Sequence, residues 1–114
     1  MAAIPTATPA FYPEQTSTLL CGTATGSANV VLGVVGDSML IQNEGPSTAF
    51  LAFGNSGVAA TAGGAVNAAN DGSFPVLAGA IMMLRVPDRG NGLNVAGITA
   101  SGTAVVRITV GSGV

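Results

Sequence analysis

This sequence is poor in the side chains that carry most protein chemistry. It has no histidine, no lysine and no tryptophan, it has one cysteine and one tyrosine, and only 7% of its 114 residues are charged. Without histidine the chain lacks the commonest zinc ligand and the usual general base, and a single cysteine excludes an internal disulfide or a thiolate cluster. The three basic residues, Arg85, Arg89 and Arg107, are too few for a nucleic-acid footprint. We therefore expect no cofactor, no metal ion and no nucleic-acid partner.

The remaining candidates for catalysis form no recognisable constellation. Cys21 lies in the apolar run TLLCG with no base available, so we predict a buried, unpaired thiol. Four of the five acids, Asp37, Glu44, Asp71 and Asp88, stand beside glycine or proline in predicted turns, where Asp caps backbone donors and Glu is exposed. Calcium binding at Asp71 is an alternative, but NAANDGS lacks the spacing of an EF-hand loop. The sequence predicts a protein that is not an enzyme.

Length and hydropathy indicate one domain that does not enter a membrane. A chain of 114 residues suits a single domain with one modest core. No apolar run approaches the roughly 20 residues that span a bilayer. The first residues, MAAIPTATPAFYPEQ, have neither a basic n-region nor an unbroken apolar stretch, so they do not predict a signal peptide. We expect a protein made in a cytoplasm, with no membrane partner.

Residues 18–114 alternate between short apolar strands and turns rich in glycine, proline and asparagine. In the closing stretch, SGTAVVRITVGSGV, Val106 and Ile108 fall on one face and Arg107 on the other, as in a half-buried strand. Similar strands recur roughly every ten residues, one of them over 74–86, and no βαβ alternation interrupts them. We predict an all-β antiparallel sandwich, jelly-roll-like, with residues 58–73 as a long loop, with or without a short strand.

Residues 1–17 differ from the rest of the chain. They carry three evenly spaced prolines, which favour an extended, polyproline-like arm. They also carry three apolar anchors, Ile4, Phe11 and Tyr12, for which a solvated tail has no use. We predict an N-terminal arm that lies on a neighbouring subunit; the alternative is a frayed terminus.

The scarcity of charge points to assembly. A free soluble protein uses charge to stay dispersed, whereas a surface covered by partners needs less of it. The alternative is a secreted or heat-stable β-protein with a Ser/Thr/Asn surface. In an assembly the arginines would contact partner carboxylates rather than only keep the chain soluble. The predicted interface residues are Ile4, Phe11, Tyr12, Arg85, Arg89 and Arg107.

Three segments of the C-terminal two thirds, LIQNEGPSTAFLAFG, FPVLAGAIMMLRVP and VAGITASGTAVVRITVGSGV, resemble small proteins encoded among the head genes of tailed bacteriophages. The nearest functional class is the capsid decoration, or cement, protein. The resemblance implies a virion protein on the capsid exterior that binds the major capsid protein, forms a homo-oligomer (dimer or trimer) on the shell, and stabilises contacts between coat subunits. The alternative is a receptor- or glycan-binding module of a head fibre or tail structure, although one tyrosine and no tryptophan provide little for sugar stacking. A small hydrolase is a third hypothesis, which the absence of histidine opposes.

Overall fold

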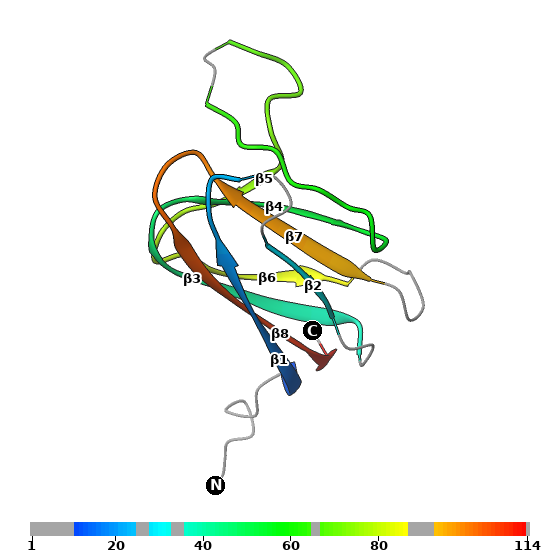
Figure 1. Cartoon of the computed structure of the whole chain (residues 1–114). Helices are drawn as coiled ribbons and strands as arrows, with labels where there is room; N and C mark the ends of the chain where they lie inside the picture. The colour runs from blue at the N-terminus through cyan, green and yellow to red at the C-terminus, as the bar shows by residue number, and fades with distance from the viewer. Residues whose placement is uncertain (1–10, 25–27, 33–35, 65–66, 87–92, 114) are drawn as a thin grey trace, which may run out of the picture.

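The structure is a computed structural model that describes residues 11–24, 28–32, 36–64, 67–86 and 93–113. In chain order its strands are β1 (Phe11–Cys21), β2 (Ala28–Val31), β3 (Ser38–Pro46), β4 (Ala49–Gly54), β5 (Phe74–Val76), β6 (Ile81–Arg85), β7 (Asn94–Thr99) and β8 (Ala104–Gly113). They form two four-stranded sheets, sheet A in the order β1-β8-β3-β6 and sheet B in the order β2-β7-β4-β5. Figure 1 shows the two sheets stacked as a sandwich.

The strand pairs are nested along the chain. β1 pairs with β8, β2 with β7, β3 with β6 and β4 with β5, and every pair is antiparallel. Two further antiparallel pairs, β3 with β8 and β4 with β7, complete the sheets. This nested order is that of a jelly roll, in which a long hairpin is rolled into two facing sheets. The predicted jelly-roll-like sandwich is confirmed.

The described residues form no helix that is long and apolar enough to cross a membrane.

Side chains alternate between the core and the outside with a period of two, as the sequence predicts. In β8, Val106 and Ile108 are buried and Arg107 is exposed. In β3, Met39 and Ile41 are buried on the same inner face. Because the period is two, a one-residue slip would turn each of these apolar sets toward water, and this fixes the register.

The core between the sheets is thin on the side of β1 and β7. Gly97 of β7 faces β1, and a Cβ at this position would collide with Sγ of Cys21 and lie 2.7 Å from Cδ2 of Leu19. The missing side chain therefore allows the two sheets to approach closely here. Cys21 is buried and unpaired, as predicted.

A second, smaller apolar cluster lies on the outer face of sheet B. Ala96 and Ile98 of β7 are buried there with Ala60 of the loop after β4, and the partly buried Phe50, Ala52, Val58 and Ala62 pack around them. The side-chain Nδ2 of Asn29 in β2 donates to the carbonyl of Val58 at 3.0 Å and helps to hold this loop on the sheet. Sheet B is therefore apolar on both faces, which explains why Phe50 and Leu51 in β4 are both apolar.

The first strand begins earlier than the sequence indicates. Residues 11–17, predicted to be part of the arm, form the first part of β1 and pair with the end of β8. Pro13 is tolerated because β1 is an edge strand, and a bulge between Pro13 and Gln15 shifts the register beside it. Residues 1–10 lie outside the described residues.

The single strand predicted over 74–86 is two strands in different sheets. β5 ends at Val76 in sheet B, and β6 begins at Ile81 in sheet A. The link turns at Gly79, whose φ of 83° is readily adopted by glycine. The predicted faces of the second half hold, since Met82, Leu84 and Val86 pack toward the core.

The turn predicted at Glu44-Gly45-Pro46 is also corrected, because these residues belong to β3. They form an irregular end of the strand, with a register shift against β8 between Asn43 and Pro46. The buried Asn43 holds this region together. Its Oδ1 accepts from the amide of Gly45 at 2.7 Å, and its Nδ2 donates to the carbonyls of Val76 (2.8 Å) and Ser47 (3.0 Å).

The long segment after β4 is a loop, as predicted, and in Figure 1 its far part projects beyond the sandwich. Its base is closed by two hydrogen bonds, from the amide of Ser73 to the carbonyl of Thr61 (2.8 Å) and from the amide of Thr61 to Oγ of Ser73 (3.0 Å). Farther out, the carboxylate of Asp71 accepts from the amide of Gly64 at 2.7 Å. The predicted capping role of Asp71 is confirmed.

Candidate protein-interaction surface

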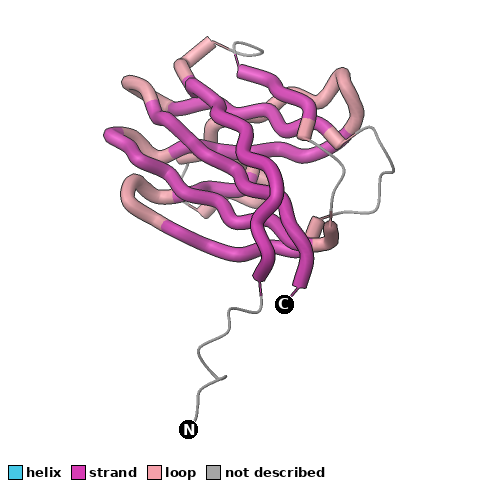
Figure 2. Tube along the Cα trace, turned by 90° about the horizontal axis from the view of Figure 1, so that it is seen from below, coloured by secondary structure: helices cyan, strands magenta, loops and turns pink. Residues whose placement is uncertain are grey.

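Four of the six predicted interface residues lie in strands of sheet A. Ile4 and Arg89 lie outside the described residues. Phe11 and Tyr12 occupy the start of β1, which Figure 2 shows beside the end of β8. Tyr12 is 69% exposed, whereas Phe11 is half-buried because its ring packs over the backbone of β8 where a Cβ on Gly111 would stand.

Arg85 lies at the same end of sheet A as Tyr12. It ends β6 on the opposite edge, opposite Ser38 of β3, and Ser38 is opposite Gly111 of β8, which in turn faces Pro13. Three strand spacings separate the two edges, roughly 14 Å at about 4.8 Å each. The structure thus places Arg85 and Tyr12 at one end of the sheet but not in contact.

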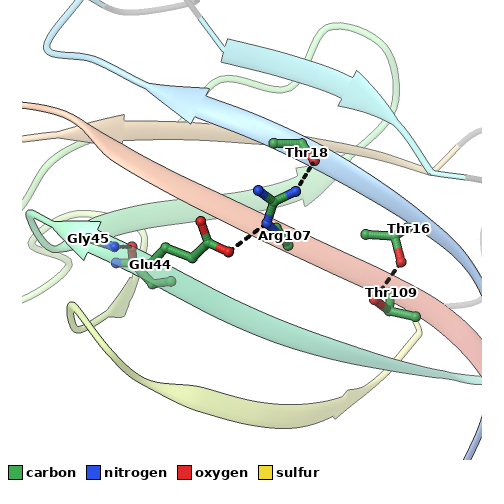
Figure 3. Close-up of polar contacts among 7 residues, drawn as sticks. Thr16, Thr18, Glu44, Gly45, Arg107 and Thr109 are labelled. Atoms are coloured by element: carbon green, nitrogen blue, oxygen red, sulfur yellow. Dashed lines mark hydrogen bonds and ion pairs between the residues drawn. The ribbon is translucent and has the colours of Figure 1, made fainter.

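Arg107 lies at the centre of the outer face of sheet A, where Figure 3 shows it between β1 and β3. Its Nε donates to Oε2 of Glu44 at 2.6 Å, and its Nη1 donates to Oγ1 of Thr18 at 3.3 Å. The hydrogen bond that Arg107 donates to Glu44 and the negative charge of that carboxylate raise the pKa of Arg107 above its ordinary value. The carboxylate expected from a partner is therefore supplied within the chain. Glu44 is exposed, as predicted, but it lies in a strand and in an ion pair rather than in a turn.

The polar part of this face continues along β1 and β8. Thr16 and Thr109 are opposite each other, and their hydroxyl oxygens lie 2.8 Å apart (Figure 3). Toward β6 the same face carries more apolar side chains. Leu40 of β3 lies opposite Met83 of β6, and Ile81, two residues before Met83 in β6, is exposed. The outer face of sheet A is thus rich in hydroxyls over β1 and β8, and over β3 and β6 it carries Leu40, Met83 and Ile81 beside the polar Gln42 and Arg85.

Most of the exposed apolar side chains lie on edge strands. Among the described residues, six large apolar side chains are exposed by 41–69%: Tyr12, Leu20, Val31, Phe74, Leu77 and Ile81. Five of them belong to the four edge strands β1, β2, β5 and β6, and Leu77 belongs to the link between β5 and β6. No residue of this set except Tyr12 was predicted from the sequence. The run Leu19-Leu20-Cys21 contains a signal for one of them, because consecutive strand residues cannot all face the core.

The side of the sandwich formed by β5 and β6 is the most apolar of these edges. Phe74, Leu77 and Ile81 are exposed by 41%, 65% and 65%. We call these three residues the β5–β6 patch. The inward-facing residues of β6 are only partly buried, so the core is incompletely covered on this side. Exposed apolar surface of this kind marks sites of protein contact.

A shallow hollow of about 340 Å³ lies at one end of the sandwich, between the β3–β4 and β7–β8 loops. Its lining has three hydroxyls and one aromatic ring, from Ser47, Thr48, Phe50, Ala100 and Ser101. The loops are tied together by a hydrogen bond from the amide of Ser47 to the carbonyl of Thr103 (3.1 Å). The hollow contains no charged side chain, so it could hold a neutral, hydroxyl-bearing group.

In the ranges that the structure describes, no three His, Cys, Asp or Glu side chains lie together as a metal ion would need. Burial raises the pKa of the Cys21 thiol from 9.0 to about 11, so the thiol is protonated at neutral pH and is a poor nucleophile.

Comparison with protein-family models, with curated proteins and with solved structures finds no match for this chain.

Proposed function

We propose that this chain is a non-enzymatic virion structural protein that binds the outer surface of a tailed-bacteriophage capsid and stabilises contacts between coat subunits. The observation that supports this most directly is the placement of exposed apolar side chains along the edge strands of a sandwich with very few charges. Apolar, weakly charged edges are a liability in a free protein and an advantage in a protein whose edges are covered by partners.

The β5–β6 patch is the surface that we assign to the coat. Phe74, Leu77 and Ile81 would each contribute on the order of 1 kcal/mol when a coat subunit covers their exposed parts. Arg85, which ends β6 and makes no ion pair with another described residue, would meet an acidic group on the coat. A protein that binds the assembled shell but not the free coat subunits stabilises the shell by mass action, and the symmetry of the shell multiplies each contact.

The jelly roll is compatible with this proposal but does not select it. Jelly rolls form many viral capsid domains, and they also form lectins. Function must therefore be argued from the surface rather than from the fold.

The direct test uses intact particles of the phage that encodes this chain. Mass spectrometry of purified particles should find the chain in a fixed ratio to the major capsid protein, and a density map should show an eight-stranded sandwich on the capsid exterior. Finding the chain only in tails or fibres, or finding none in the particle, would overturn the proposal.

A variant pair then tests the surface. Leu77→Glu with Ile81→Glu should weaken binding to undecorated capsids at least about tenfold, because it places charge in the contact. The matched control is Val31→Glu on the opposite edge of the sandwich, where the side chain is 57% exposed. Equal loss of binding in both variants would show that the contact is not located on the β5–β6 patch.

A second candidate function is a receptor- or glycan-binding module, and the hollow at the β3–β4 and β7–β8 loops is the observation that favours it. Its hydroxyls and the ring of Phe50 offer hydrogen bonds and one apolar wall to a sugar. A glycan array separates the two functions. Binding that is lost in Ser101→Trp, which fills the hollow, supports the glycan function, whereas capsid binding that survives this substitution supports the first.

A further inference from the structure

We propose that the free edge of β1 is a self-association surface, and that two copies of this chain pair through it antiparallel about a two-fold axis at Thr18. The proposal concerns the isolated chain and does not depend on the proposed capsid function. In the dimer the two A sheets would join into one continuous eight-stranded sheet.

The first observation is that β1 is the least protected edge of the sandwich. The other edge strands are short: β2 has four residues, β5 has three including Pro75, and β6 has five and ends in Arg85. β1 has eleven residues, with β8 on one side and no described strand on the other. Natural proteins blunt long edges with charge, proline or bulges, because an open edge invites another strand.

The second observation is where the protection of β1 stops. Pro13, Glu14 and the bulge before Gln15 guard only the start of the strand. Residues 15–21 contain no proline, no charge and no irregularity of register against β8. Leu20, in this segment, is 64% exposed. The unguarded part of β1 therefore offers both a backbone edge and apolar side-chain surface.

The third observation is that this segment is complementary to itself. A two-fold axis at Thr18 pairs all of residues 15–21 with their copies, and it leaves the bulge and the chain beyond the strand end at Cys21 outside the contact. Thr16 of each copy then faces Leu20 of the other on the outer face of the sheet. Threonine, whose side chain carries a methyl group, is a compatible cross-strand partner for leucine, and no like charges lie opposite each other.

The nearest charges do not oppose this pairing. Arg107 lies one strand inward from Thr18 and is already paired with Glu44 at 2.6 Å. Across the new contact the two Arg107 side chains would be separated by three strand spacings, roughly 14 Å, which exceeds the screening length at physiological salt. An isologous contact of this kind closes on itself and yields a dimer rather than a fibre.

The test uses sedimentation velocity of the full chain over a concentration series, together with a charge exchange. The unmodified chain should show a concentration-dependent dimer. Thr16→Lys with Leu20→Lys places lysine opposite lysine twice and should raise the dimer Kd at least about tenfold. Thr16→Glu with Leu20→Lys places opposite charges in the same two pairs and should restore the dimer.

The charge exchange tests the proposed register as well as the contact, because it depends on Thr16 of one copy lying opposite Leu20 of the other. The control is Val31→Lys on the edge of β2, which should leave the dimer unchanged, and melting temperatures should show that every variant is folded. A chain that remains a monomer at all concentrations overturns the proposal. A dimer that persists in the double-lysine variant, or that the Glu/Lys variant fails to restore, also overturns it, because the contact would then lie elsewhere or have another register.

Discussion

Sγ of Cys21 occupies the space directly over Gly97, at the place where any other residue at position 97 would put its Cβ. Cys21 ends β1 in sheet A and Gly97 lies in β7 of sheet B, so this pair sets how closely the two sheets approach. The contact is made by the smallest residue on one side and a small, uncharged thiol on the other. Larger side chains would have to push the sheets apart.

Gly97→Ala should therefore destabilise the fold by about 1–3 kcal/mol, the usual cost of overpacking a core. Denaturant unfolding followed by circular dichroism measures this loss. Combining Gly97→Ala with Cys21→Ala should recover part of the stability, because the second change removes the sulfur from the collision. Strictly additive losses in the double variant would mean that the two residues do not compete for the same space.

The buried thiol also predicts a pH dependence of stability. Burial raises the pKa of Cys21 from 9.0 to about 11. A group whose pKa is raised by folding contributes its full stability below the unfolded pKa and loses it as the pH rises toward the folded pKa. The free energy of unfolding should thus fall between about pH 9 and pH 11, by on the order of 2 kcal/mol.

Cys21→Ala should remove that fall in the free energy of unfolding, because the variant has no thiol at position 21. In the same pH range the native thiol should react slowly with a thiol reagent and rapidly once denaturant is added. Rapid labelling of the native protein at neutral pH would contradict the burial of Cys21.

Asn43 is expected to be among the most sensitive positions in the chain. It is 2% exposed, and its amide makes three hydrogen bonds to the backbone around the end of β3. Asn43→Ala leaves those backbone groups without partners and should cost about 2–4 kcal/mol, seen as a fall in melting temperature of about 10 °C or more. Asn55 is the matched control, because its Oδ1 also accepts from an amide two residues later but is exposed. Asn55→Ala should lower the melting temperature by only a few degrees.

Two deletions separate the predicted arm from the strand that follows it. Deleting residues 1–10 should leave the melting temperature nearly unchanged if these residues serve as an arm for a neighbouring subunit. Deleting residues 1–15 removes the part of β1 that pairs with Val110–Gly113 and uncovers the backbone that the ring of Phe11 covers. This longer deletion should lower the melting temperature by several degrees. Equal melting temperatures for the two truncated proteins would show that residues 11–15 add no stability to the sandwich.

The sequence by itself determined the class of the fold and the facing of most strands. The alternation in β8 and β3 is local information, because successive side chains of any strand point to opposite faces. The spacing of the turn residues is also local information, and short strands at regular spacing predicted a sandwich. The burial of Cys21 also followed from local information, namely its apolar neighbours in the run TLLCG.

Only the tertiary structure decided where the strands begin and end and which residues lie on the edges of the sheets. Residues 11–17 became strand because β8 offers them a partner, although their prolines suggested an arm. The strand predicted over 74–86 broke at Gly79 because its halves pair with β4 and β3 in different sheets. Glu44 and Arg107 form an ion pair although 63 residues separate them in the sequence. The exposed apolar residues can be recognised as edge residues only from the strand order. Each of these outcomes depends on pairing between distant segments, and a local pattern contains no information about its partner.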